Sequence, residues 1–121
     1  MILRAAAFAV AATSAPVVAF PPLSCEGRVD DAFWGLELLG NVAVWHTAEE
    51  RRTLPIASTH PLPGPDKRSV FVITDEDDLH LAVATETGCV RNDLSFPVRL
   101  NVLSPDDSDR QVRMACCTVA E

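Results

Sequence analysis

The sequence predicts a small all-β domain: an antiparallel barrel or sandwich, stapled by disulfides, with at most one short helical segment. Three observations predict it. Apolar residues recur with a period of two in short segments, turn-forming residues separate these segments, and four cysteines follow an N-terminal leader. Short strands at such regular spacing are typical of small barrels and sandwiches.

The leader opens the chain. Arg4 gives it a positive charge, residues 5–12 form a short apolar run, and Val17-Val18-Ala19 ends in the small residues that precede a cleavage site. We therefore expect a signal peptide over residues 1–19 and a single β domain over residues 20–121. Because neither the leader nor any later segment has the roughly 20 apolar residues of a membrane-spanning helix, we expect no transmembrane segment.

Export predicts a periplasmic location. A lipoprotein is the less favoured alternative, because in Leu23-Ser24-Cys25 the leucine lies one residue too close to the cysteine for a lipobox. The formal net charge of −7 argues against nucleic acid or an anionic membrane as partner, since both favour clustered Lys and Arg. An unidentified protein or cell-wall ligand, cationic in the simplest case, fits this charge better.

The first predicted hairpin is the clearest. In residues 33–39, Trp34, Leu36 and Leu38 fall on one face, Gly40-Asn41 offers the positive-φ residues of a tight turn, and residues 42–46 return. Trp34 and Trp45 then lie on its two strands. Core or cross-strand packing is favoured for them over a ligand platform.

The next segment is less regular. Residues 53–57 form a weak strand, because proline cannot donate to a strand ladder, and a Pro/Gly-rich loop follows at residues 61–65. Only residues 47–52 look briefly helical. Residues 68–74 are β-branched and strand-like.

An acidic cluster at residues 75–78 separates that strand from the next, at residues 79–85. Leu79, Leu81 and Val83 face one way, and His80 alternates away from them, so we expect it to be exposed. The acidic cluster could bind calcium. It lacks the ligands at alternate positions and the central glycine of a calcium loop, so an acidic turn is favoured.

A third strand pair closes the domain. Residues 96–103 place Phe96, Val98, Leu100 and Val102 on one face, a polar turn spans residues 104–109, and residues 110–119 form the last strand. Asp106, Asp107 and Asp109 are again interpreted as turn residues rather than calcium ligands.

The cysteines Cys25, Cys89, Cys116 and Cys117 allow three disulfide pairings. Adjacent residues on a strand point to opposite faces, so Cys116 and Cys117 should bond to different partners. We favour Cys89–Cys116 together with Cys25–Cys117, which would anchor the start of the mature chain. The alternatives are a thiol-redox pair or a soft-metal site at Cys116-Cys117 with a histidine, although no C-x-x-C motif is present.

No residue carries a catalytic signature. A G-x-S-x-G motif is absent, and His46, His60 and His80 are far apart in sequence, so a metal triad is disfavoured. We expect no metal, no cofactor and no enzyme. A pocket in which several scattered polar side chains converge would instead indicate an enzyme.

The order of these motifs resembles an uncharacterised family of small bacterial envelope proteins. The resemblance lies in Cys25 before Phe33-Trp34-Gly35-Leu36, in Cys89 before a polar segment ending at Phe96-Pro97, and in Ala115-Cys116 near the end. This chain departs from the family in its longer segment before Phe33, in Ala32 where the family has proline, and in its shortened polar segment. The family is distantly similar in style to membrane-bound inhibitors of c-type lysozyme, which are also cysteine-stapled barrels.

This resemblance implies an exported protein that acts by binding, with inhibition of a lysozyme-like hydrolase as one concrete version. A metal-handling or thiol-redox protein of the periplasm is the competing hypothesis.

Overall fold

The computed structural model describes residues 20–29, 31–105 and 112–120, which form an all-β fold. The predicted signal peptide, and Asp106, Asp107 and Asp109 of the predicted polar turn, lie outside the described residues. Within the described part of the chain, no helix is long and apolar enough to cross a membrane. The strands are β1 (Leu23–Val29), β2 (Ala32–Leu39), β3 (Val42–Thr47), β4 (Arg51–Leu62), β5 (Arg68–Asp75), β6 (Asp78–Thr85), β7 (Cys89–Arg91), β8 (Leu94–Phe96), β9 (Val98–Leu103) and β10 (Arg113–Val119).

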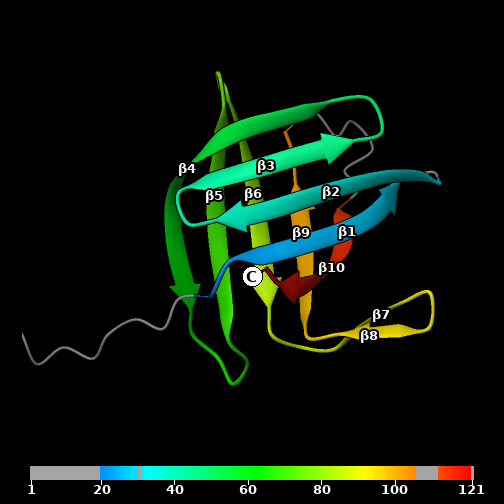
Figure 1. Cartoon of the computed structure of the whole chain (residues 1–121). Helices are drawn as coiled ribbons and strands as arrows, with labels where there is room; N and C mark the ends of the chain where they lie inside the picture. The colour runs from blue at the N-terminus through cyan, green and yellow to red at the C-terminus, as the bar shows by residue number, and fades with distance from the viewer. Residues whose placement is uncertain (1–19, 30, 106–111, 121) are drawn as a thin grey trace, which may run out of the picture.

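Eight of these strands close into a barrel in the order β1-β10-β9-β6-β5-β4-β3-β2, and every neighbouring pair is antiparallel. In Figure 1, β1, β2 and β3 run across the picture in front, and β5, β6 and β9 run nearly upright behind them. The two layers therefore cross at a steep angle. This confirms the predicted all-β class and selects the barrel over the sandwich.

Strand β4 joins the two layers. Its first half pairs with β3 and its second half with β5, and the register shifts between Ile56 and Ser58, a bulge that bends the strand around the corner (Figure 1). The weak strand predicted at residues 53–57 is thus too short: β4 has 12 residues.

Pro55 does not interrupt β4. The bond from the Ile56 N–H to the Asn41 carbonyl flanks the pair of Val42 and Pro55, which is therefore a non-hydrogen-bonded pair. The nitrogen of Pro55 faces away from β3, at a position before the β5 pairing begins, so the proline removes no ladder bond. The helical interpretation of residues 47–52 is also wrong. Thr47 ends β3, its hydroxyl accepts the N–H groups of Glu49 and Glu50 in a tight turn, and β4 begins at once.

The first hairpin forms as predicted. Trp34, Leu36 and Leu38 are all buried, and Leu39 pairs with Val42 across a two-residue turn. Gly40 alone has a positive φ, of 76°, so the turn needs left-handed backbone at one position rather than at both.

The core fills the barrel with inward-facing side chains from every wall strand. These include Leu23, Leu36, Ile73, Leu100 and Val102, which are fully buried. Strand β6 contributes only the small residues Ala82 and Ala84 to this core, while Leu79 and Leu81 on its other face are 53% and 39% exposed. The expected exposure of His80 is therefore wrong, because His80 shares the inner face with the two alanines.

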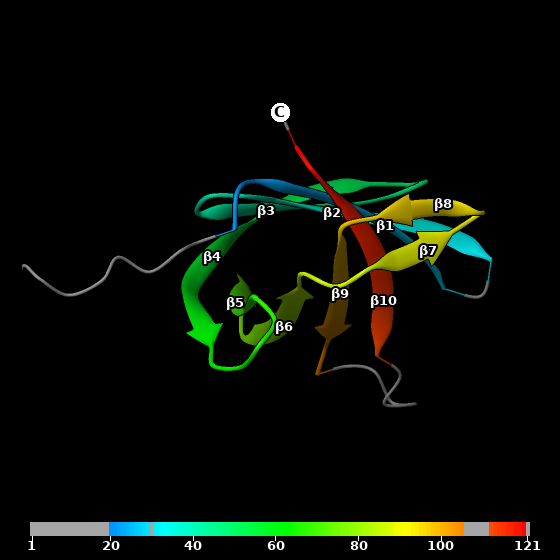
Figure 2. The same cartoon turned by 90° about the horizontal axis from the view of Figure 1, so that it is seen from below.

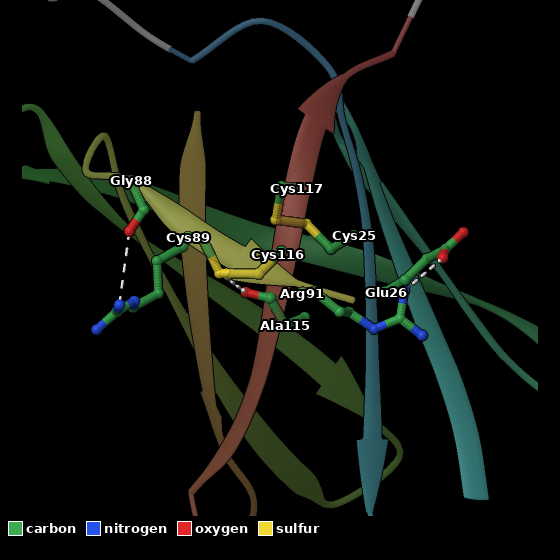
Figure 3. Close-up of a disulfide and its surroundings, with 9 residues drawn as sticks. Cys25, Glu26, Gly88, Cys89, Arg91, Ala115, Cys116 and Cys117 are labelled. Atoms are coloured by element: carbon green, nitrogen blue, oxygen red, sulfur yellow. Dashed lines mark hydrogen bonds and ion pairs between the residues drawn. A yellow bond between two sulfur atoms is a disulfide. The ribbon is translucent and has the colours of Figure 1, made fainter. Parts of the chain in front are cut away.

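Both favoured disulfides are present. Cys25 and Cys117 face each other across β1 and β10 and bond inside the barrel. Cys116 points to the outer face and bonds to Cys89, which fixes the β7–β8 hairpin against β10 outside the wall (Figure 2). An ion pair of 3.1 Å from Arg91 Nη1 to Glu26 Oε1 ties the same hairpin to β1 (Figure 3).

Candidate functional site

One end of the barrel is polar inside. Along several strands the inward-facing positions are apolar through the core and become polar or charged at this end, which we call the mouth. The residues that line its inner hollow together with Leu54 are Trp45 on β3, Arg52 on β4, Asp75 on β5, His80 on β6, Ser104 just after β9, and Arg113 on β10. We call these six residues the mouth cluster.

A chain of polar contacts runs through this cluster. Arg52 Nη2 donates to Asp75 Oδ1 at 2.5 Å, and the other carboxylate oxygen, Oδ2, lies 3.6 Å from His80 Nε2. His80 Nδ1 is 2.7 Å from the hydroxyl oxygen of Ser104. Four residues from four separate segments of the chain are thereby linked across the mouth.

Electrostatics keeps the first pair charged. The hydrogen bond from Arg52 is the main cause that lowers the pKa of Asp75 below its usual value, and the charge of Arg52 and the contact with His80 act in the same direction against the effect of burial. The same bond raises the pKa of Arg52. Asp75 is therefore a carboxylate at neutral pH and can only accept hydrogen bonds.

Aromatic rings form one wall of the mouth. The rings of Trp34 and Trp45 stack with centroids 5.7 Å apart and planes 27° apart. The guanidinium of Arg113 lies 5.4 Å from the ring of Trp45, and the ring of His80 lies 5.4 Å from it as well. Trp34 is buried, and its indole N–H finds no acceptor among the described residues.

Two open hollows meet at Trp45 and Arg113. The inner one, lined by the mouth cluster, has a volume of about 260 Å³. The outer one, of about 530 Å³, lies between the end of β1, the start of β2 and the β3–β4 turn, with Val29, Phe33 and Trp34 as its main apolar lining. Their combined size is within the range of small-molecule sites.

Carboxylates surround the mouth. Five lie in the β1–β2, β3–β4 and β5–β6 turns, all at this end of the barrel, and the sixth begins β6; they are Asp31, Glu49, Glu50, Glu76, Asp77 and Asp78. We call them the acidic rim. The charges of Glu50 and Glu76 both raise the pKa of Arg52, so two of these turns converge on the mouth cluster. Besides Arg52 and Arg113 of the mouth cluster, two further arginines lie at this end: Arg28 donates to the Asp31 carbonyl, and Arg51 lies 3.8 Å from Glu37.

The opposite end of the barrel differs. Phe20 packs against the core there, with the ammonium of Lys67 4.6 Å from the centre of its ring. The exposed acids Asp66 and Glu86 belong to the loops at this end. The polarity of the molecule is therefore asymmetric along the barrel axis.

The histidines expected to be separate do lie apart. His60 hydrogen-bonds to Ser58 at 2.9 Å on the surface, His46 lies beside Phe33, and His80 alone enters the mouth. In residues 20–29, 31–105 and 112–120, no three His, Cys, Asp or Glu side chains gather as a metal site would require. The acidic cluster at residues 75–78 does form a turn, centred on Glu76 with a φ of 57°.

Sequence reasoning missed most of the mouth cluster. The sequence pattern places Arg52 in a helical segment and Asp75 and Ser104 in turns, and for Trp45 it favours packing over ligand binding. A signal was present, because Asp75, His80 and Arg113 each continue the alternation of a buried face by two residues. It could be used only once the inner face of each strand was known.

No protein-family model matches this chain, and neither a curated protein nor a solved structure matches it.

Proposed function

We propose that this protein is exported to the periplasm and acts by binding a cationic partner at the mouth of its barrel. The concrete partner we propose is a lysozyme-like hydrolase, which the chain would inhibit. The observation that carries the proposal is the acidic rim: six carboxylates in or next to three turns around one open end. The resemblance to small bacterial envelope proteins supports the same assignment.

Charge favours such an encounter. The chain has a formal net charge of −7, and the rim concentrates carboxylates where the barrel opens. A strongly basic protein would be steered to this end, since complementary potentials raise association rates and select partners. The far end, with Phe20 and Lys67, offers no comparable attraction.

Rigidity supports a binding role. The rim turns join strands of a closed barrel, and the Cys25–Cys117 bond links its first and last strands. A partner that meets a rigid surface loses less conformational entropy on binding. Disulfides persist in oxidising compartments, which agrees with export. Binding at the rim involves no chemical step, so for this function the expectation of a non-enzyme is kept.

The competing hypothesis, metal handling or thiol-redox chemistry, would use free sulfur at Cys116 or Cys117. Both sulfurs are bonded in the structure, to Cys89 and Cys25. Free-thiol titration of the protein purified from the periplasm separates the two hypotheses. Two intact disulfides support the binding hypothesis, and reducible or metal-protected thiols at Cys116 and Cys117 would support the competing one.

Inhibition assays test the proposal directly. Lysis of a cell-wall suspension by a c-type lysozyme should slow when the mature protein is added at micromolar concentration. Glu76→Lys on the rim should weaken inhibition several-fold, mainly through slower association. Glu86→Lys, the matched control at the far end, makes the same change in net charge and should leave inhibition unaffected. Unchanged lysis with the unmodified protein, or equal losses in the two folded variants, would remove the proposal.

A further inference from the structure

The contact between Ser104 and His80 resembles an activated nucleophile. The serine hydroxyl oxygen lies 2.7 Å from the imidazole Nδ1, within a hollow of about 260 Å³ that is also lined by a carboxylate and two arginines. A serine hydroxyl is a weak nucleophile unless a neighbouring base can take its proton. A pocket in which scattered polar side chains converge is also the feature that would indicate an enzyme.

The carboxylate of Asp75, 3.6 Å from His80 Nε2, favours the tautomer of His80 that carries its proton on Nε2. Because Asp75 is ionised, it can accept a hydrogen bond from Nε2–H but cannot donate one. With the proton on Nε2, the lone pair of Nδ1 faces the Ser104 hydroxyl and can accept its proton. The separation of 3.6 Å between His80 Nε2 and Asp75 Oδ2 is longer than a hydrogen bond, as such contacts often are before a substrate binds.

Arg52 and Arg113 complete the arrangement. Arg52 donates to Oδ1 of Asp75 and thereby fixes the carboxylate, whose other oxygen, Oδ2, is the one nearer to His80 Nε2. Arg113 lines the same inner hollow as Ser104, and a guanidinium there can stabilise the negative charge that develops on a carbonyl oxygen.

We propose that Ser104 and His80 form a catalytic pair that hydrolyses small, uncharged carboxylic esters, with Asp75 as the residue that positions His80. The inner hollow is small and suits a short acyl group. The adjoining hollow of about 530 Å³, with Val29, Phe33 and Trp34 in its lining, suits an apolar or aromatic alcohol. The acidic rim disfavours anionic substrates. This activity uses the interior of the mouth and does not depend on partner binding at the rim.

The reaction balances with water as the only co-reactant. Ser104 Oγ bonds to the carbonyl carbon while its proton passes to His80 Nδ1, and the carbonyl electron pair moves to oxygen. Collapse of this intermediate breaks the ester bond, and the departing alkoxide takes the proton from His80. Water then attacks the acylated Ser104 and gives a proton to His80. The second collapse frees the carboxylic acid and returns the proton to Ser104.

The chain contains its own negative control. Ser58 and His60 are also hydrogen-bonded, at 2.9 Å, but this pair is on the surface, and no acidic contact to His60 is found in the described residues. A serine–histidine contact alone should therefore be unreactive here. The proposal requires Ser104 to react and Ser58 to stay unmodified.

A fluorophosphonate probe measures this difference. Incubation of the intact, oxidised protein should give one adduct in which Ser104 Oγ is bonded to phosphorus and fluoride has left, located by peptide mass spectrometry. The chain contains no tyrosine, another residue that such probes modify. Ser104→Ala should abolish the adduct, and Ser58→Ala should leave it unchanged. No adduct, or equal modification of the two serines, would overturn the proposal.

Hydrolysis of p-nitrophenyl acetate tests turnover. Ser104→Ala and His80→Gln should lower the rate by roughly 100-fold, the usual effect of a general base, with the thermal melting of each variant as a check on folding. Asp75→Asn should lower the rate and shift its pH profile, and Asp75→Glu should restore part of both. Rates that are equal in the original protein and in folded Ser104→Ala would reject the activity. Because lysozyme inhibition is measured separately, failure here leaves the rim proposal untouched.

Discussion

Cys116 and Cys117 are consecutive residues whose disulfides leave β10 on opposite sides of the barrel wall. Cys117 bonds to Cys25 inside, and Cys116 bonds to Cys89 outside (Figure 3). The inner bond closes the barrel between its first and last strands, and the outer bond attaches an accessory hairpin. The two bonds should therefore contribute to stability in different ways.

Removing the inner disulfide should cost more than removing the outer one. The bonds span 92 and 27 residues, for which the loss of chain entropy corresponds to about 4.6 and about 3.6 kcal/mol. The pair Cys25→Ala/Cys117→Ala also leaves a gap in the core. Urea unfolding of this variant and of Cys89→Ala/Cys116→Ala measures the two losses of stability. A larger loss for the outer pair would contradict the prediction that the inner disulfide contributes more. Only the outer variant should speed amide exchange selectively in β7 and β8.

Acid should weaken the mouth through Asp75. The pKa of Asp75 is lowered in the folded state, so its stabilising effect is complete above the unfolded value of about 3.9 and is lost as the pH falls through the folded value. Asp75→Asn should thus be less stable than the original protein at neutral pH, and the difference should shrink between about pH 5 and about pH 2.

Urea midpoints measured across that range check this prediction. Asp66→Asn, an exposed aspartate in a loop at the far end, is the matched control. A difference between the original protein and Asp75→Asn that stays constant with pH would show that the carboxylate has no stabilising contact.

Gly27 should be intolerant of a side chain. A Cβ there would lie 2.4 Å from the Met114 carbonyl oxygen and 2.9 Å from the indole nitrogen of Trp34, and the backbone oxygen cannot easily move away. We expect Gly27→Ala to lower the free energy of unfolding by about 1–3 kcal/mol.

Two other glycines provide comparisons for the Gly27→Ala variant. The atoms nearest to a Cβ at Gly35 would belong to the ring of His46, which can rotate, so Gly35→Ala should cost less. Gly88 has open space around it, and Gly88→Ala should change stability by about 0.5 kcal/mol or less. Thermal melting of the three variants should rank them in this order, and a Gly27→Ala protein as stable as Gly88→Ala would contradict the packing of Trp34.

Which face of β6 is buried can be tested by introducing glutamine at two positions, one on each face. Leu79 is 53% exposed on the outer face, so Leu79→Gln should change the free energy of unfolding by about 0.5 kcal/mol or less. Ala82 is fully buried, and Ala82→Gln would force a polar amide into a packed core at a cost of about 3 kcal/mol or more. Denaturant unfolding that ranks the two variants in the opposite order would reverse the assignment of the faces.

Local chemistry in the sequence was sufficient for the hairpin of β2 and β3 and for the disulfides, but it predicted neither β1 nor the β7–β8 hairpin. Gly40 supplies a positive φ between two alternating segments, and strand alternation alone separates the partners of Cys116 and Cys117. These features depend on residues close together in the chain or on the simple geometry of a strand, so they can be predicted without knowledge of the rest of the fold.

The inner face of β6 could not be predicted in the same way. A period of two defines two faces but does not say which one is buried, and size misleads here because leucines lie outside and alanines inside. The large rings of Trp34 and Trp45 and the side chain of Phe71 already occupy the interior, which leaves room only for small residues on β6. The contact of His80 with Ser104 joins residues 24 positions apart and depends on the β6–β9 pairing, so the sequence could not predict it either.

The pairing of β1 with β10 sets the order in which the molecule can be completed. Strand β1 cannot pair with β10 until Arg113–Val119 has been synthesised. Cys117, the disulfide partner of Cys25, follows it by 92 residues. A nascent chain that ends before β10 carries two unsatisfied sheet edges, on β1 and β9, which could pair with other chains. Because the barrel closes only when β10 is present, premature termination is a route to aggregation.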